Sequence, residues 1–342
     1  MSNRLTLRVL IVLLAGVALG MACSSGGDSA KPPGKPSSGT GSLIIAMPSG
    51  LVEYSIKSGA QKPLIKPETA NTFLLDPAIS PDGKRLVYIV QPPPKIGAGT
   101  YDAGSDLWVA NRDGTGAHVV LTHEQPNQLI RFPQWQDNET LLVVMQEIAT
   151  DNGKTTVSYV LNRLPAAGGA RTKVIGGALA FGLSPDGKRL AYARLAPQGS
   201  ETLNAADVDG TNDVTLVSAS EHLAPFNVPR YSPDGKQIAF AAADQAGARA
   251  ASPEFVSVAS FGVPAAVVLD GLPEDIWTVK ASGGRPVRVA DLKEDLPALA
   301  WSGDGQHLYV LGSAGLYDVS VGTGAVDRLG DGAFHGQLAW AP

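Results

Sequence analysis

The sequence of 342 residues contains very little cysteine and little charge. Cys23 is its only cysteine, so no disulfide can form within the chain. Charged residues make up 17% of the sequence and the formal net charge is −5, so bulk electrostatics give no support to a nucleic-acid partner. The fold must therefore be stabilised by its own hydrophobic core and by the closure of its sheets.

Near the N-terminus, the apolar stretch over residues 9–18 is too short to span a bilayer comfortably. Two arginines precede it, and small residues lead up to Cys23 as in a bacterial lipobox, with Gly20 at the position usually taken by leucine. We therefore predict a lipoprotein-type signal peptide over residues 1–22, with lipid attached to Cys23. An ordinary cleaved signal and an uncleaved anchor are the alternatives.

Residues 23–41 consist mainly of Ser, Gly, Pro, Lys, Ala and Asp and have no apolar periodicity. We expect a disordered tether there and a folded body over residues 42–342. The chain as a whole has 39 glycines and 25 prolines, which indicates many turns between short strands and hence an all-β fold.

One phrase of five residues recurs along the body, each time before an apolar strand. In it, proline pre-sets the second position of a tight turn, Asp bonds its own backbone, and Gly adopts a positive φ. Each copy therefore predicts a hairpin between a first and a second strand. A weaker fifth copy covers residues 136–139, and the four clear copies are Ser80-Pro81-Asp82-Gly83-Lys84, Ser184-Pro185-Asp186-Gly187-Lys188, Ser232-Pro233-Asp234-Gly235-Lys236 and Ser302-Gly303-Asp304-Gly305-Gln306.

A third and a fourth strand are predicted after each hairpin, which gives the four-stranded units of a β-propeller. A bulky residue precedes each turn and is expected to pack between neighbouring units: Ile79, Trp135, Leu183, Tyr231 and Trp301. The N-terminal unit over residues 42–65 lacks its first strand, and residues 337–342 resemble a first strand. We predict that the two ends complete one blade together and close a six-bladed ring, which leaves no open sheet edge.

The repeated phrase resembles the WD40-like β-propeller repeat of the TolB-like family. The resemblance covers residues 42–342 and implies a six-bladed propeller in the cell envelope. It is specific for the fold and weak for the function, because unrelated functions share this fold.

The sequence offers no catalytic motif and no cofactor motif. Its five histidines lack the spacing of a zinc site, and no G-x-S-x-G nucleophile elbow occurs. Ser184 and Ser232 belong to the repeated turns. The acidic segment over residues 207–213 resembles half of a calcium loop but recurs as an ordinary hairpin turn. We therefore predict no catalytic residue, no metal site and no cofactor.

Two connections between second and third strands are long, over residues 91–104 and 244–273. Long loops on a rigid scaffold are where binding usually occurs. The second one is unusually apolar, which favours either a partner-binding flap or an extra hairpin packed on the side of a blade. The residues predicted to contact a partner are Pro92, Pro93, Pro94, Tyr101, Phe255, Phe261, Val267 and Leu269.

The sequence thus predicts an exported, non-enzymatic binding scaffold of the cell envelope. We expect it to be a monomer whose partner is an envelope protein or a peptide. Lipid on Cys23 would hold it to the cell membrane or the outer membrane, with the body in the periplasm or outside the cell. The alternative is an enzyme, or a sugar- or ion-binding propeller, that uses polar residues of the central channel.

Overall fold

The computed structural model describes residues 41–97, 100–151, 154–195, 200–245, 272–331 and 337–341. These residues form strands and one short 3-10 helix, η1 (Ala219–Glu221). Within the described ranges, no helix is long and apolar enough to cross a membrane. Cys23 lies outside the described residues.

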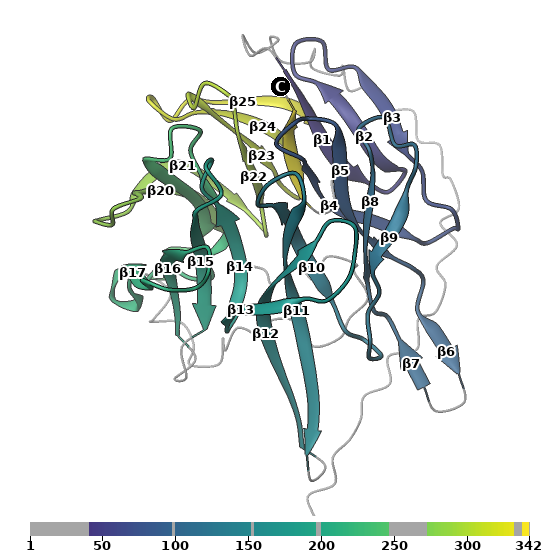
Figure 1. The fold of residues 1–342 in the computed structure, drawn as a ribbon. Helices are drawn as coiled ribbons and strands as arrows, with labels where there is room; N and C mark the ends of the chain where they lie inside the picture. Colours follow the sequence, from purple (N-terminus) through teal and green to yellow (C-terminus); the bar gives the residue numbers. More distant parts are fainter. Residues whose placement is uncertain are drawn as a thin grey trace, which may run out of the picture. The chain divides into compact units, whose positions relative to one another are not determined.

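Six antiparallel four-stranded sheets make up the body, and we number them as blades 1 to 6 (Figure 1). Blade 1 contains β26 (Leu338–Ala341), β1 (Ser42–Met47), β2 (Gly50–Ser55) and β3 (Gln61–Ile65). Blade 2 contains β4 (Phe73–Ile79), β5 (Arg85–Gln91), β8 (Asp106–Asn111) and β9 (His118–Leu121). Blade 3 contains β10 (Ile130–Trp135), β11 (Thr140–Asp151), β12 (Lys154–Pro165) and β13 (Thr172–Gly176).

The other three blades follow in chain order. Blade 4 contains β14 (Ala178–Leu183), β15 (Arg189–Leu195), β16 (Glu201–Asp207) and β17 (Val214–Val217). Blade 5 contains β18 (Asn227–Tyr231), β19 (Gln237–Ala242), β20 (Glu274–Lys280) and β21 (Val287–Glu294). Blade 6 contains β22 (Ala298–Trp301), β23 (His307–Leu311), β24 (Gly315–Ser320) and β25 (Val326–Asp331).

The first strand of each blade lies innermost and contacts the first strands of both neighbouring blades. These contacts run from β26 to β4, β10, β14, β18 and β22, and from β22 back to β26. A closed circle of six inner strands is the arrangement of a six-bladed β-propeller. The predicted fold class is therefore confirmed.

The ring closes where the two ends of the body meet. Strand β26 pairs with β1 in antiparallel register, with Leu43 opposite Trp340 and Ile45 opposite Leu338. The indole of Trp340 also stacks on the ring of Tyr309 in blade 6, at a centroid distance of 5.7 Å. The predicted completion of the N-terminal blade by the C-terminal strand is confirmed.

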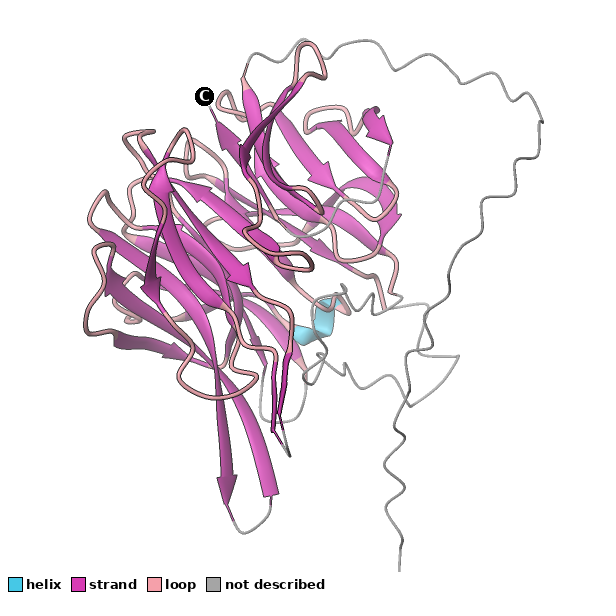
Figure 2. Ribbon diagram, turned by 90° about the vertical axis from the view of Figure 1, so that its right-hand side faces the viewer, coloured by secondary structure: helices cyan, strands magenta, loops and turns pink. Residues whose placement is uncertain are grey.

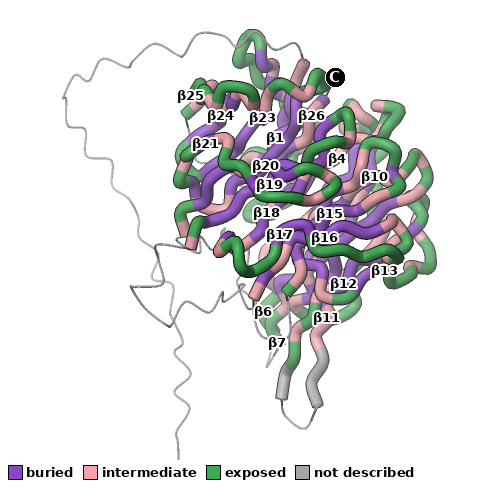
Figure 3. Tube along the Cα trace, turned by 90° about the vertical axis from the view of Figure 1, so that its left-hand side faces the viewer, coloured by how far each residue is buried: buried purple, intermediate pink, exposed green. Residues whose placement is uncertain are grey.

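Each boundary between neighbouring blades holds one hydrophobic cluster. Because side chains alternate along a strand, a single strand contributes to two clusters. In β1, Leu43 and Ile45 pack against blade 6, whereas Ile44 and Ala46 pack against blade 2. Strands that are covered on both faces are therefore apolar along their whole length. In Figure 3, the buried residues lie mainly along the middle strands of the blades.

The repeated turns have the same internal bonds in all four clear copies. In blade 4, Ser184 Oγ donates to Asp186 Oδ1 at 2.6 Å and accepts the N–H of Arg189 at 2.9 Å. The same carboxylate oxygen accepts the N–H of Lys188 at 3.1 Å, and Gly187 has a φ of 68°. These bonds satisfy the polar groups of the turn and leave the following strand free to pair.

Two indoles in the position before the turn bond across blade boundaries. Trp135 Nε1 of blade 3 donates to the carbonyl of Ala78 in blade 2 at 3.2 Å. Trp301 Nε1 of blade 6 donates to the carbonyl of Arg230 in blade 5 at 2.9 Å. The expected packing between neighbouring units is present at these positions.

Antiparallel topology gives the propeller two different ends. The turns joining first to second strands and third to fourth strands lie at one end, which we call the turn face. The connections between second and third strands, and those leading to the next blade, lie at the other end, which we call the loop face.

Candidate functional site

A small two-stranded sheet extends the loop face at blade 2 (Figure 2). It consists of β6 (Lys95–Gly97) and β7 (Thr100–Asp102), inserted between β5 and β8, and we call these two strands the flap. Ile96 is 81% exposed and Tyr101 is 38% exposed, both on the flap. Large apolar side chains exposed together on a projecting element are typical of a contact surface for another protein.

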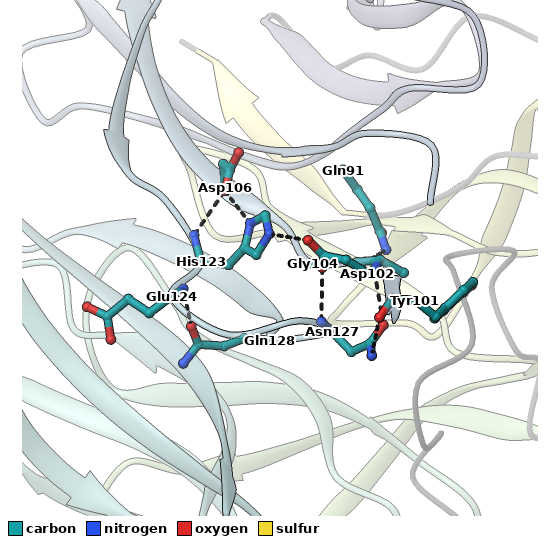
Figure 4. Close-up of polar contacts among 10 residues, drawn as sticks. Gln91, Tyr101, Asp102, Gly104, Asp106, His123, Glu124, Asn127 and Gln128 are labelled. Atoms are coloured by element: carbon teal, nitrogen blue, oxygen red, sulfur yellow. Dashed lines mark hydrogen bonds and ion pairs between the residues drawn. The ribbon is translucent and has the colours of Figure 1, made fainter. Parts of the chain in front are cut away.

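The base of the flap is held by a histidine between two carboxylates, which we call the Asp–His–Asp bridge (Figure 4). His123 Nδ1 lies 2.6 Å from Asp106 Oδ1, and its Nε2 lies 3.0 Å from Asp102 Oδ2. Ionised carboxylates accept hydrogen bonds only, so both ring nitrogens must donate. The imidazole is therefore a cation in this arrangement.

The bridge shifts the pKa of His123 and that of Asp102. Burial lowers the pKa of His123, but hydrogen bonds and charge from Asp102 and Asp106 outweigh this effect and place the pKa above its usual 6.5. Burial acts to raise the pKa of Asp102, but the N–H groups of Asn127 and Gly104 and the contact with His123 lower it to about 2. The bridge is thus most stable with a protonated histidine and ionised carboxylates.

Further hydrogen bonds fix the segment that leads from β7 to β8. Asn127 Oδ1 accepts the N–H of Ala103 at 3.0 Å, and its Nδ2 donates to the carbonyl of Tyr101 at 3.0 Å. Gln91 Nε2 donates to the carbonyl of Ala103 at 3.1 Å. A Cβ at Gly104 would lie 2.4 Å from the ring of His123, so the close approach requires glycine. The flap therefore rises from a rigid base.

Blade 3 carries a second projection of the loop face. Strands β11 and β12 are each 12 residues long and pair without a register shift from Thr140–Pro165 to Asp151–Lys154. On one side, β10 pairs with β11 only as far as Met145 of β11. On the other side, β13 pairs with β12 only as far as Val160 of β12. The part beyond these residues, 146–151 with 154–159, is a two-stranded ribbon that extends from the ring in Figures 1 and 2.

Four of the eight predicted contact residues lie in the described part of the chain. Pro92, Pro93 and Pro94 join β5 to β6, and Tyr101 lies in β7. These four therefore belong to the flap and its approach. The other predicted contact residues lie outside the described residues: Phe255, Phe261, Val267 and Leu269.

Sequence reasoning did not identify the ribbon or the Asp–His–Asp bridge. A signal for the ribbon exists, because Asn152-Gly153 stands between two segments rich in β-branched residues, as in a two-residue hairpin. The bridge has no local signal, since Asp102 and His123 are 21 residues apart and belong to different connections.

Three charged residues stand on the six innermost strands: Asp76, Arg131 and Arg230. Arg131 Nε donates to Asp76 Oδ2 at 2.9 Å. Arg230 Nη1 donates to the carbonyl of Phe181 at 3.0 Å, and its Nη2 lies 3.4 Å from Gln337 Oε1 of blade 1. Burial lowers the pKa of Arg230 to about 10. The inner strands thus present two guanidinium groups and one carboxylate.

Two hollows open on the turn face. The larger, of about 540 Å³, lies between blades 1 and 2 and is lined by Glu53, Lys62, Leu64, Gly83, Lys84, Asn111, Arg112 and Asp113. The smaller, of about 350 Å³, lies between blades 4 and 5 and is lined by residues of two repeated turns, including Asp186, Asp234 and Gly235. Within the described ranges, no group of three His, Cys, Asp or Glu side chains is arranged to hold a metal ion.

Solved structures of TolB proteins are similar to this chain in fold. TolB from Acinetobacter baumannii has a TM-score of 0.58 and 14% sequence identity, over 88% of this chain and 67% of that one. A protein assigned as TolB from Agrobacterium tumefaciens has a TM-score of 0.53 and 16% identity, over 89% of this chain and 100% of that one. In sequence, the chain matches no protein-family model and no curated protein. At these identities the similarity establishes the propeller fold alone.

Proposed function

We propose that the protein is a non-enzymatic binding scaffold of the cell envelope, and that its loop face binds an envelope protein or a peptide. The observation that carries the proposal is the flap, where Ile96 and Tyr101 are exposed on a small sheet with a rigidly bonded base. Exposed apolar side chains on a preorganised element lose little conformational entropy when a partner covers them. The fold shared with TolB structures is compatible with this role.

The proposal includes the predicted N-terminal organisation. Residues 1–22 act as a lipoprotein signal peptide, Cys23 carries the lipid, and residues 23–41 form the tether. A single acyl chain gives marginal membrane binding, so the multiply acylated cysteine of a lipoprotein would be needed for stable anchoring. The WD40-like repeat family remains the family to which we assign the turn phrase. We propose a monomer without a cofactor.

Photo-crosslinking in cells that express the full-length chain tests the binding face. A photoreactive phenylalanine analogue is placed at Ile96 on the flap, and in a control variant at Val287 on the outermost strand of blade 5. Val287 is 62% exposed, so both positions are accessible and apolar. We expect one envelope protein to be crosslinked from position 96 and not from position 287. Equal crosslinking from both positions, or none from position 96, contradicts the proposed binding face.

Detergent partitioning of cell extracts tests the anchor. We expect the wild-type chain in the detergent phase and the Cys23→Ser variant in the aqueous phase, because the substitution removes the acylated thiol. Metabolic labelling with a radioactive fatty acid should mark the wild type alone. A Cys23→Ser variant that stays fully membrane-bound shows that lipid on this residue is not what holds the protein.

A further inference from the structure

The six innermost strands surround the central channel and carry more positive than negative charge. Their charged side chains are the guanidinium groups of Arg131 and Arg230 and the carboxylate of Asp76. These residues come from blades 3, 5 and 2. Charges that are partly withdrawn from water are normally paired inside a protein. One of the two guanidinium groups therefore lacks a counter-ion among the innermost strands.

The single carboxylate of these strands is bonded to Arg131. Asp76 Oδ2 accepts Arg131 Nε at 2.9 Å and the N–H of Phe132 at 3.0 Å. The side chain of Asp76 is only 1% exposed, so this pair is held in place. In the part of the chain that the structure describes, no hydrogen bond or ion pair joins Asp76 to Arg230. The charge of Asp76 nevertheless favours the protonated form of Arg230, which places the three groups in one electrostatic environment.

Arg230 has polar partners but no counter-ion among the described residues. Its Nη1 donates to the carbonyls of Phe181 and Pro229, both at 3.0 Å, and its Nη2 lies 3.4 Å from Gln337 Oε1. Gln337 precedes β26 of blade 1, and blade 6 separates blades 5 and 1 in the ring. The guanidinium thus reaches across the channel, and its neutral acceptors orient it without compensating its charge.

Arg131 offers free donor groups in a fixed orientation. Its Nε is held by Asp76, and its guanidinium lies over the ring of Phe132 at 4.8 Å from the centroid. Its Nη1 and Nη2 bond to no described residue, and its side chain is 33% exposed. A guanidinium that is fixed in this way can bind a carboxylate through two parallel hydrogen bonds.

We infer that the central channel binds a carboxylate group of a ligand, which accepts hydrogen bonds from Arg131 and is stabilised by the charge of Arg230. A carboxylate carries one negative charge and so matches the one guanidinium that lacks a counter-ion. The inference goes beyond the proposed function, because this site is built on the innermost strands whereas the flap lies between β5 and β8. Either can fail without the other.

Nuclear magnetic resonance of the purified full-length protein with ¹⁵N-labelled arginine tests the inference at the site itself. The Nε–H signals of Arg131 and Arg230 are assigned from the variants in which each is replaced by lysine. Acetate is the probe, and acetamide is its uncharged analogue. At constant ionic strength, we expect acetate to shift both signals along a saturable curve and acetamide to shift neither.

A second pair of probes identifies the source of the carboxylate. N-acetyltriglycine presents the C-terminal carboxylate of a peptide, and its C-terminal amide lacks that charge. Tighter binding of N-acetyltriglycine than of acetate indicates a peptide C-terminus, and tighter binding of acetate indicates a small free acid. The amide should not shift either signal.

Two substitutions of the channel should change acetate affinity in opposite directions, as read from the Arg131 signal. Arg230→Gln removes the uncompensated charge, so acetate should bind about tenfold more weakly. Asp76→Asn removes the competing negative charge, so acetate should bind about threefold more tightly. Asparagine retains an acceptor for Arg131 Nε and tolerates the positive φ of 49° at this position.

Arg189→Gln is the matched control, because Arg189 is paired with Asp207 at 3.1 Å on the second and third strands of blade 4. This variant should bind acetate as the wild type does. If Arg230→Gln fails to fold, the direction of the change in Asp76→Asn still decides.

Several results would overturn the inference. The first is an absence of any shift with acetate, which would show that the charge of Arg230 is already compensated within the folded chain. The others are equal shifts with acetate and acetamide, weaker acetate binding by Asp76→Asn, and equal losses of affinity in Arg230→Gln and Arg189→Gln.

Discussion

His123 determines how firmly the base of the flap is held, because both of its ring nitrogens bond to carboxylates. Its pKa is higher in the folded protein than in the unfolded chain. Its stabilising contribution is therefore complete below about pH 6.5 and is lost as the pH rises through the folded value. The contribution of Asp102, whose pKa falls from 3.8 to about 2, is present above 3.8 and is lost as the pH falls through 2.

We predict that His123→Ala speeds amide exchange at Gly104 and Asn127, whose N–H groups bond to Asp102. The expected factor is about tenfold near pH 5.5, which corresponds to about 1.4 kcal/mol, and it should decrease at alkaline pH as the wild-type histidine loses its proton. Comparing the variant with the wild type at the same pH cancels the intrinsic pH dependence of exchange.

His118→Ala is the control for this measurement, because His118 is exposed and, among the residues that the structure describes, its ring bonds to the carbonyl of Gly116 alone. That variant should leave exchange at Gly104 and Asn127 unchanged at every pH. An effect of His123→Ala that is the same at acidic and alkaline pH would show that the imidazolium charge does not hold the flap base.

At the scale of the element, the sequence predicted those turns and strands whose conformation is set by neighbouring residues. The phrase around Asp82 or Asp186 specifies a turn through its own side-chain bonds, so each copy indicates a hairpin without knowledge of the rest of the chain. The match between residues 337–342 and the first strand of blade 6 indicated the closure that Leu43 and Trp340 make.

Elements that depend on contacts between distant segments were not predictable in the same way. The Asp–His–Asp bridge joins the end of β7 and the start of β8 to the segment that follows β9, and these come together only when the strands of blade 2 have paired. The inner strands also contain residues with positive φ directly before proline, namely Asp76, Phe132 and Val228. Such conformations are unfavourable for residues other than glycine, so tertiary packing must impose them.

At the scale of the whole molecule, the ring depends on every boundary between blades. Each hydrophobic cluster is shared by two blades, so no blade buries both of its faces alone. Strand β26 contributes to the clusters on both sides of blade 1, with Leu338 against blade 6 and Ala341 against blade 2. With no disulfide available, this strand is the connection that completes the circle.

Removal of residues 337–342 should therefore destabilise the whole body rather than one blade. The loss of buried Leu338 and of the Trp340 stack predicts a decrease of about 5 kcal/mol in the free energy of unfolding, since each such truncation costs about 2–5 kcal/mol. It also exposes the edge of β1, which should promote self-association. Chemical denaturation and light scattering measure the two effects.

A synthetic peptide of residues 337–342 added in trans should restore stability, and a scrambled peptide should not. A truncated chain that unfolds at the wild-type denaturant concentration and stays monomeric would show that the circle is held without its closing strand.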